Sequence, residues 1–313
     1  MKMFRRAQEG VNPDLEIGRY LTEAGFAHTA PLLGAMEYHR GVRSEPHTVG
    51  VLYAYVPNEG DAWHYTLDQL GLFYETALQA IPDELTDVPT WPSPMLAGAV
   101  SEVPSIPDEV VQAIGPYLDS AELLGQRTAE LHRALAAGTG EAFEPEPFTT
   151  LYQRAVYQSM RSQVRPTLTL VRRALSQLDD RTRPLAESLL EREAELLDRF
   201  SAVRSHRIDV SRIRVHGDYH LGQVLHAGRD FVIIDFEGEP SRSPTERRIK
   251  RSAITDVAGM IRSFQYAVAA GLRALEDRGL LRPEQRDALT RRGAVWEHWV
   301  TGQFLRGYLH DAE

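Results

Sequence analysis

The chain has 313 residues and a formal net charge of −9, and 42% of its residues are hydrophobic. This composition suits one large domain or two lobes with a full core, and the acidic balance argues against a nucleic-acid-binding surface, which needs a basic face. The absence of cysteine excludes disulfides, thiol catalysis and thiolate metal sites. The sequence contains no run of about 18 apolar residues, so no membrane span is predicted. Its first residues also lack the apolar core of a signal peptide. We therefore expect a cytoplasmic protein.

The first eighty residues predict a short sheet with two helices. Residues 1–6 suit a strand that begins abruptly. Asn12 is a good N-cap, and Pro13 stands where a first helical residue would be. Residues 48–56 are rich in β-branched and aromatic side chains, which predicts a buried strand. Residues 66–69 fit a capping box, so we expect a helix from there to about residue 80.

The middle of the chain changes from irregular to helical. Residues 82–116 contain seven prolines, which predicts a connector or lid. Further helices are expected over 149–178, broken near Pro166, and over 181–203, after a split at Asp179. Before them, a helical face is indicated by apolar spacing at Leu124, Thr128, Leu131 and Leu135.

The last third predicts a small hairpin between helices. Residues 212–215 suit a short strand, and residues 223–226 and 230–235 suit two more strands joined through Gly228. Helical spacing then returns over residues 254–275. A final helix contains Trp296, Trp299, Phe304 and Tyr308.

Three residues around the hairpin have the chemistry that phosphoryl transfer needs. That reaction requires a carboxylate to accept the proton of the acceptor hydroxyl and oxygen ligands to hold Mg²⁺ against the nucleotide. Asp218 leaves a strand into a loop, Gln223 follows five positions later, and Asp235 ends the second hairpin strand. An amide at the fifth position after the catalytic Asp is typical of kinase loops. The hairpin is expected to bring Gln223 and Asp235 to one metal.

Each of these residues also has an ordinary interpretation. A single Asp in a loop is usually a turn or cap residue, and a Gln at a strand start is usually surface. His216 fits a hydrogen-bonded structural role, and we assign it that role. The ordered set of a strand, His-Gly-Asp, an amide, a hairpin and Asp-Phe-Glu favours a kinase-like site.

Longer strings resemble a known family. Residues 216–223 are similar to the His-Gly-Asp loop of the aminoglycoside phosphotransferase superfamily. Residues 217–225 and 235–240 resemble the maltokinases, including those fused to trehalose synthase. The same likeness extends over the segments 2–6, 12–17, 246–252 and 256–264.

The resemblance implies an α+β, protein-kinase-like bilobal fold. It implies a residual N-lobe over residues 1–58 and a mainly helical C-lobe over residues 59–313 that carries the catalytic hairpin. The implied activity is ATP-dependent phosphorylation of maltose to maltose 1-phosphate. Another small-molecule acceptor, such as an aminoglycoside, is the alternative enzyme function.

The resemblance also implies roles for single residues. Asp218 accepts the proton of the sugar hydroxyl, and Gln223 and Asp235 bind Mg²⁺. His220 either contacts the transferred phosphate or shapes the loop. Two further carboxylates have supporting roles: Asp256 braces the catalytic loop through its backbone amides, and Glu237 lies near the metal.

The nucleotide is expected at the N-terminal strands. Lys2 stands where a phosphate-anchoring lysine would be, and Glu16 where its helix partner would be; both are alternatively surface charges. Ala54 and Val56 would offer backbone groups to adenine. The glycine-rich hairpin that kinases place before this lysine is missing from the sequence. We therefore expect a truncated chain, and a non-catalytic module that docks on trehalose synthase remains an alternative.

Aromatic side chains are candidates for the sugar pocket. Sugars are typically held by aromatic faces with polar groups around them, and Tyr266, Trp299 and Tyr308 are the residues proposed for this role. Because these aromatics have helical spacing, packing in the core is the alternative interpretation.

Overall fold

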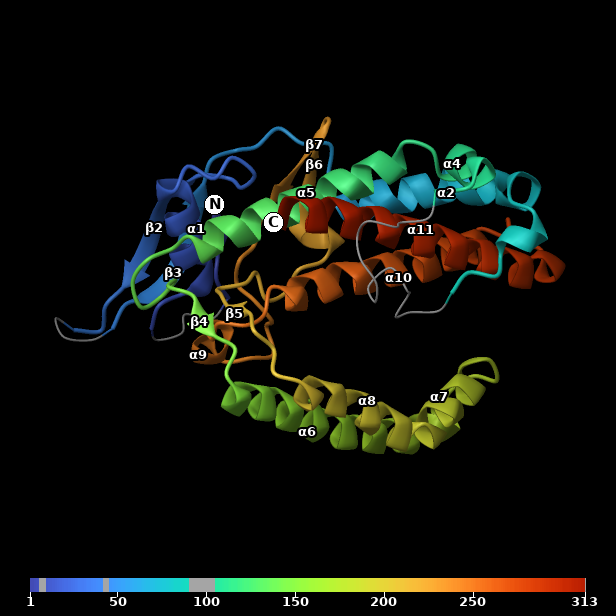
Figure 1. Ribbon diagram of the computed structural model, residues 1–313. Coiled ribbons are helices and arrows are strands. Elements are labelled where there is room, and N and C mark those ends of the chain that lie inside the picture. Colours follow the sequence, from blue (N-terminus) through green and yellow to red (C-terminus); the bar gives the residue numbers. More distant parts are fainter. Residues whose placement is uncertain (6–9, 42–44, 90–104, 313) are drawn as a thin grey trace. The chain divides into compact units, whose positions relative to one another are not determined.

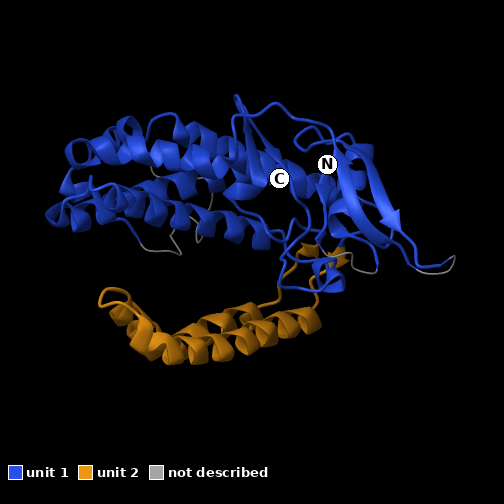
Figure 2. Ribbon diagram, turned by 180° about the vertical axis from the view of Figure 1, so that it is seen from behind, with its two compact units in different colours: residues 1–145, 213–313 blue, residues 146–212 orange. Residues whose placement is uncertain are grey.

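The computed structural model describes residues 1–5, 10–41, 45–89 and 105–312 (Figure 1). The chain forms two compact units, one of residues 1–145 with 213–313 and one of residues 146–212 (Figure 2). The sequence analysis does not predict the second unit, which is inserted into the first. The expected boundary at residue 58 stays a prediction.

The N-terminal part of the first unit is a three-stranded antiparallel sheet beside a helix. The strand order is β1 (Lys2–Met3), β3 (His47–Tyr53), β2 (Leu32–Tyr38). Asn12 caps helix α1 (Pro13–Glu23) by accepting the amide of Asp14, which confirms the predicted start. The short first strand is also confirmed.

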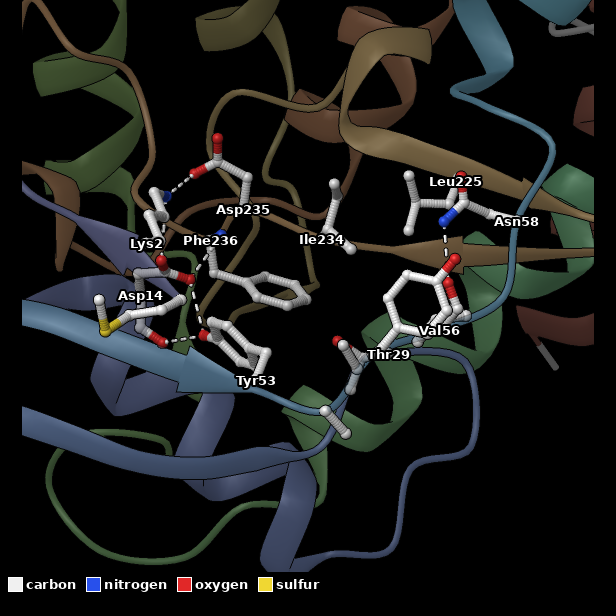
Figure 3. A pocket seen from close by; sticks show the side chains of 14 residues that line it. Lys2, Asp14, Thr29, Tyr53, Val56, Asn58, Leu225, Ile234, Asp235 and Phe236 are labelled. Atoms are coloured by element: carbon white, nitrogen blue, oxygen red, sulfur yellow. Dashed lines mark hydrogen bonds and ion pairs between the residues drawn. The ribbon is translucent and has the colours of Figure 1, made fainter.

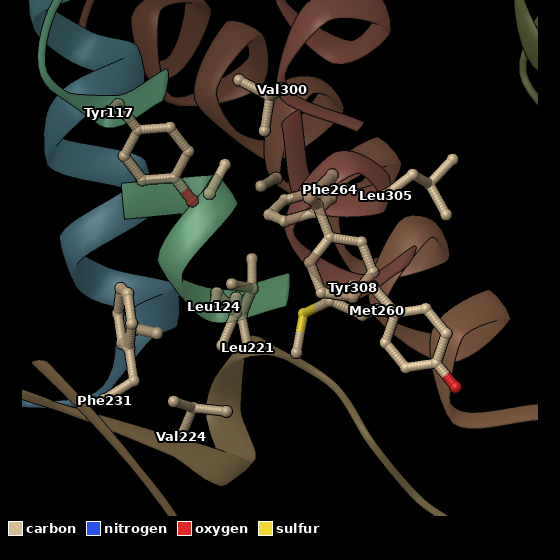
Figure 4. Packing of buried hydrophobic residues seen from close by; sticks show 14 of the residues in the cluster. Tyr117, Leu124, Leu221, Val224, Phe231, Met260, Phe264, Val300, Leu305 and Tyr308 are labelled. Carbon is tan, nitrogen blue, oxygen red and sulfur yellow. The ribbon is translucent and has the colours of Figure 1, made fainter. Parts of the chain in front are cut away.

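Helices form most of the first unit. Buried aromatic and aliphatic side chains from several helices pack into one cluster (Figure 4). The helical face predicted from Leu124 to Leu135 is fully buried. The helices are α2 (Ala62–Ala80), α4 (Asp108–Ile114), α5 (Tyr117–Ala136), α10 (Ile254–Asp277) and α11 (Arg286–Ala312), with single turns at η1 (Asp83–Leu85) and η5 (Pro283–Gln285).

Two expectations for these helices are wrong. Helix α2 begins before Thr66, because Asp61 is its N-cap and accepts the amide of His64. Thr66 lies inside the helix, fully buried, and its hydroxyl is bonded to Ala62 and Tyr117. The expected connector also contains a regular helix, α4, and its residues 90–104 lie outside the described residues.

The predicted hairpin is present. Strands β6 (Val224–Ala227) and β7 (Asp230–Ile233) pair antiparallel, and Gly228 in the turn has φ +71°. The turn η4 (Leu221–Gln223) precedes the hairpin, and the short helix α9 (Pro244–Arg247) follows it. The hairpin therefore connects the predicted catalytic loop directly to Asp235.

The second unit is a helical hairpin on a two-stranded base. Strands β4 (Glu146–Pro147) and β5 (Ser211–Arg212) pair, and between them run α6 (Thr150–Ala174), η3 (Leu175–Gln177), α7 (Thr182–Glu191) and α8 (Glu193–Ser205). The expected break near Pro166 is wrong, because α6 continues through this residue. Pro166 and Ser162 are both exposed, so water can reach the carbonyl that lacks an amide partner. No helix of the described residues is both long and apolar enough to span a bilayer.

Candidate functional site

The first cavity of the site lies in the first unit, where the N-terminal sheet faces the hairpin. It has a volume of about 360 Å³. Figure 3 shows Lys2 and Asp235 at one end and Val56 and Asn58 at the other. The predicted nucleotide residues Lys2, Ala54 and Val56 all line it. Residues far apart in the sequence therefore meet around one small cavity.

Lys2 is surrounded by three carboxylates. Its Nζ lies 3.0 Å from Asp14 Oδ2, 2.6 Å from Asp235 Oδ1 and 2.5 Å from Glu237 Oε1. Burial alone would lower the pKa of Lys2, but these carboxylates raise it above its usual value. The ammonium group is therefore charged at any physiological pH, and it neutralises part of an otherwise strongly negative cluster.

Asp14 is a site residue that the sequence analysis missed. It is fully buried, its Oδ1 accepts bonds from the Tyr53 hydroxyl (2.8 Å) and the Phe236 amide (3.2 Å), and its other oxygen accepts from Lys2. Burial and the charge of Asp14 raise the pKa of Tyr53, so the phenol stays protonated as a donor. The signal was available: Asp14 has helical spacing with the buried residues Ile17 and Leu21, so its carboxylate faces the interior.

Glu16 has other partners than Lys2, which corrects the expected pair. It forms ion pairs with Arg214 and with Arg248, the latter at 2.7 Å. Burial opposes the shift, but Arg248 and Arg214 lower the pKa of Glu16. Glu16 also does not line the first cavity. The two acids lie on different faces of α1, and only Asp14 points to Lys2.

Asp235 has an unusual backbone conformation at the end of the hairpin. Its φ is +67°, the only positive φ among the non-glycine residues that the structure describes. Such a conformation is rare outside glycine and often marks functional sites. The Phe236 amide bonded to Asp14 helps to hold this turn. Asp235 thereby points to Lys2 rather than along the strand.

A divalent cation fits part of this cluster. Carboxylate oxygens of Asp14, Asp235 and Glu237 lie within 4.8 Å of one another, and hard oxygen ligands suit Mg²⁺. Gln223, the other predicted ligand, has a neutral amide side chain. Its backbone carbonyl accepts a hydrogen bond from the Ile234 amide at 3.0 Å, so the two residues lie side by side. Its role as a ligand stays a prediction.

A second cavity, of about 820 Å³, lies around the predicted catalytic loop in the same unit. Asp218, His220 and Tyr266 line it together with Trp63, which the sequence analysis did not single out. Burial raises the pKa of Asp218, and nearby histidines offset only part of this effect. A carboxylate with a raised pKa in a cavity is a suitable proton acceptor.

The histidines of the loop hold its shape. His216 Nε2 must donate to the Ile234 carbonyl (2.9 Å), so its Nδ1 is the acceptor facing the Asp218 amide at 3.4 Å. His220 Nδ1 accepts the Gly222 amide at 3.1 Å, which favours the loop-shaping interpretation over phosphate contact. His216 thus connects the residue before Asp235 with Asp218.

Asp256 lies under this loop, where the resemblance places it. It is buried and accepts the amides of His216 (2.8 Å) and Gly217 (2.9 Å). His132 Nε2 lies 3.0 Å from Asp256, and His132 Nδ1 lies 3.0 Å from the Tyr308 hydroxyl. Burial opposes the shift, but the bonds from His132 and Gly217 hold the pKa of Asp256 below its usual value.

Two of the three proposed sugar-binding aromatics are core residues. Tyr308 is 5% exposed and Trp299 9%, and both belong to the buried cluster; Figure 4 shows Tyr308 packed near Met260 and Phe264. Tyr266 is 57% exposed and lines the second cavity. Position on the helix decides this difference, because α11 is packed on several sides and α10 leaves one face open.

Parts of the chain are similar to known phosphotransferases. Residues 105–238 match the phosphotransferase enzyme family, APH. A glucosamine kinase from Streptacidiphilus jiangxiensis is 39% identical over 54 residues, which are 17% of this chain and 12% of that protein. A glucosamine kinase from Mycolicibacterium smegmatis is 44% identical over 62 residues, which are 20% of this chain and 15% of that protein.

Solved structures share the fold. A glucosamine kinase in crystal form B has a TM-score of 0.66 and 21% identity, covering 97% of this chain and 58% of that one. A glucosamine kinase in complex with glucosamine, ADP and inorganic phosphate has a TM-score of 0.64 at the same identity and coverage. The chain thus spans 58% of the length of these structures. These structures support the expected mixed, mostly helical, kinase-like fold class, and the bilobal arrangement stays a prediction.

Proposed function

We propose that this chain carries the phosphoryl-transfer site of an ATP-dependent sugar kinase. The observation that supports this most is the single side chain of His216. It bonds Ile234, which lines the first cavity, and faces the amide of Asp218, which lines the second. A nucleotide in the first cavity and a sugar in the second would therefore both lie beside the loop that carries His216 and Asp218.

The first cavity suits a nucleotide. The Ala54 amide already donates to Pro31, which leaves the Ala54 carbonyl and the Val56 amide for adenine. Lys2 would contact phosphate oxygens, since its charge is fixed by its surroundings. Asp235 and Glu237, with Gln223 as the predicted amide ligand, would hold Mg²⁺. The cation, when bound, neutralises charge that develops on the phosphates.

The second cavity suits the acceptor. Asp218 would accept the proton of the attacking hydroxyl as the oxygen bonds to the γ-phosphorus and ADP leaves. Its raised pKa favours this transfer, because a more basic carboxylate takes a hydroxyl proton more readily. Asp256, through the amides of His216 and Gly217, keeps the loop in place while the charge on Asp218 changes.

Maltose is the acceptor that we propose to test first. The resemblance of residues 217–225 and 235–240 to maltokinases favours it, and a cavity of about 820 Å³ has room for more than a monosaccharide. Glucosamine is the second candidate, because related and similarly folded kinases bear its name. A partnership with trehalose synthase, tested by co-purification, is the extension that the resemblance to fused maltokinases suggests.

The decisive experiment compares two variants for ATP-dependent phosphorylation of maltose and glucosamine. Asp218→Asn keeps the shape of the side chain but removes the proton acceptor, so we expect turnover to fall about 100- to 10,000-fold. Asp180→Asn is the matched control, because the side chain of Asp180 is 99% exposed in the second unit. Unchanged turnover in Asp218→Asn would contradict the mechanism, and transfer to neither sugar would contradict the acceptor class.

A further inference from the structure

Positive and negative residues are unevenly distributed along this chain. Residues 44–126 contain thirteen Asp and Glu residues and neither Lys nor Arg, whereas residues 146–212 contain twelve arginines against nine Asp and Glu residues. Segments of opposite sign attract one another, so this asymmetry points to surfaces that take part in binding. The most uniformly charged helices of the two segments are α2 in the acidic one and α6 in the basic one.

Helix α6 has a row of arginines along one face. The helix contains neither Asp nor Glu. Successive members of the row are 7, 4 and 7 positions apart, which places them on the same side of the helix over about 27 Å. The members of this arginine row are Arg154, Arg161, Arg165 and Arg172.

Much of the charge of the arginine row has no counterion. Arg172, at one end, pairs with Glu193 of α8 at 2.7 Å. Arg154 and Arg165 are exposed, and neither forms an ion pair or hydrogen bond with any residue that the structure describes. Their guanidinium groups are therefore available to an anionic ligand.

An aromatic ring gathers further positive charge beside the row. The guanidinium of Arg161 lies 5.4 Å from the centroid of the Tyr157 ring, and that of Arg204, from α8, lies 3.7 Å from the same centroid. Cations are attracted to the face of such a ring. Helix α8, which packs beside α6 (Figure 1), thus adds a cation at this point of the row.

Helix α2 has acidic residues with a similar spacing. Asp61, which caps the helix and bonds His64, is followed at steps of seven positions by Asp68 and Glu75, and the helix contains neither Lys nor Arg. Asp68 and Glu75 are exposed, and no ion pair or hydrogen bond joins either of them to another described residue. Between these two lies an exposed leucine, Leu72, so the acidic row also offers apolar surface.

The two rows match in spacing as well as in sign. Asp68 and Glu75 are about two helical turns apart, and so are Arg154 and Arg161. Two helices packed side by side can therefore place a carboxylate opposite each guanidinium, and arginine forms bidentate bonds with carboxylates. Every further copy of the chain presents such an acidic row.

We infer that α6 of one copy of this chain docks on α2 of a second copy, with the arginine row facing Asp68 and Glu75. Neither row lines either cavity of the site, so the contact does not depend on the proposed function. Two whole chains of net charge −9 repel one another. At about 0.15 M salt, however, charges more than about 8 Å apart are largely screened, and the close pairs of the contact dominate.

Sedimentation equilibrium of the full chain at about 0.15 M salt tests this contact. The mean mass should rise above 35.2 kDa as the protein concentration increases. Reversing the arginine row in Arg154→Glu/Arg165→Glu should raise the Kd of self-association about tenfold or more, because attractive pairs become repulsive ones. The control is Arg173→Glu/Arg199→Glu, which makes the same charge change at exposed positions outside the row and should alter the Kd less than about twofold.

Reversal of the acidic row removes the effect of net charge from the test. Asp68→Arg/Glu75→Arg makes the whole chain less negative, yet it should also raise the Kd about tenfold or more. A mixture of the two reversed variants should associate about as tightly as the natural chain, because each supplies the sign that the other lacks. This recovery also requires that both variants are folded.

Three results overturn the inference: a mass of 35.2 kDa at every concentration, an equal loss in the control, or no recovery in the mixture. Single-stranded DNA and phosphatidylserine vesicles are the probes for other occupants of the arginine row. If the chain stays single and binds one of them through Arg154 and Arg165, that polyanion replaces the second copy and the inference is also overturned.

Discussion

Two buried carboxylates, Asp14 and Asp256, have similar positions in the fold, but their negative charges are compensated by different groups. Each lies in the first turn of a helix, α1 or α10, and each is almost completely buried, at 0% and 1% exposure. Each accepts a backbone amide from a segment of the site, Phe236 for Asp14 and His216 for Asp256. They differ in what balances their charge.

The difference separates a fixed support from an exchangeable one. Asp256 is balanced by backbone amides and by His132, which are held by the packed helices around them. Asp14 is balanced by Lys2, whose side chain is 31% exposed and also bonds Asp235. A buried charge needs compensation in either case. Only Lys2 is exposed enough to exchange its partners, while Asp14 keeps the bonds from Tyr53 and Phe236.

Replacing Asp256 should break the fixed support and have the largest effect on stability. In Asp256→Asn the side-chain amide brings a donor to a place where His132, His216 and Gly217 already donate. We expect a loss of about 3–5 kcal/mol in the free energy of unfolding, as for other disrupted buried charge networks. Urea unfolding measures it, with Asp277→Asn, on the same helix and 73% exposed, as the control. A loss no larger than that of the control would contradict the assignment.

The stabilisation that Asp256 contributes depends on pH, and the sign of this dependence is defined. The pKa of Asp256 is lowered in the folded chain, so the stabilisation is present above the ordinary value of about 3.9 and is lost as the pH falls through the folded pKa. The stability gap between the natural chain and Asp256→Asn should therefore be constant near neutral pH and shrink below about pH 4. A gap that widens on acidification would contradict the sign.

Asp14→Asn should cost less stability than Asp256→Asn. Lys2 keeps Asp235 and Glu237 as partners in this variant, and an asparagine oxygen can still accept the Phe236 amide. We expect a loss of about 1–3 kcal/mol, measured by urea unfolding. Glu16→Gln is a useful comparison on the same helix, because Glu16 does not bond Lys2. If only Glu16→Gln weakened Mg-ATP binding in calorimetry, Asp14 would not be the partner that matters for the nucleotide.

Replacing the tyrosine near each buried carboxylate by phenylalanine sharpens the comparison between Asp14 and Asp256. Tyr53 donates to the carboxylate of Asp14, whereas Tyr308 bonds a ring nitrogen of His132 and reaches Asp256 only through that ring. Hydrogen bonds to charged groups are worth about 1.5–3 kcal/mol and neutral ones about 1 kcal/mol. Tyr53→Phe should therefore destabilise the chain more than Tyr308→Phe in thermal or urea unfolding. The reverse order would show that Tyr308 supports Asp256 more strongly than its position suggests.

The smallest expected effect is a shift in the acid limb of activity. Burial raises the pKa of Asp218, and the proposed proton acceptor works only when ionised. Activity should therefore fall with decreasing pH through a pKa above the ordinary value of about 3.9. The measurement is kcat/KM against pH with a sugar that the chain phosphorylates. An acid limb at or below the ordinary value would contradict the role of burial.

Local signals in the sequence were sufficient for several elements. Asn12 with Pro13 predicted the start of α1, and the helical spacing from Leu124 to Leu135 predicted the buried face of α5. The Gly228 turn predicted the hairpin, which the structure confirms. Each of these depends on neighbours within a few residues, such as a cap, a periodic face or a turn.

Signals failed where two explanations fit the same local pattern. Thr66 fits a cap, yet Asp61 caps the helix and Thr66 bonds Tyr117 across the core. Pro166 suggests a break, yet the helix continues because the affected carbonyl is on the solvent side. Tyr266 and Trp299 have the same helical spacing as core residues, and only packing shows that Tyr266 is open to a cavity.

The sequence by itself predicted a kinase-like site from the order of Asp218, Gln223 and Asp235, because Gln223 and Asp235 flank one hairpin, whose local pairing brings them together. Only the tertiary structure decided which acid Lys2 meets and which aromatics face the second cavity. Lys2, Asp14 and Asp235 come from three distant segments. Burial and charge compensation, which depend on every neighbour at once, select Asp14 over Glu16.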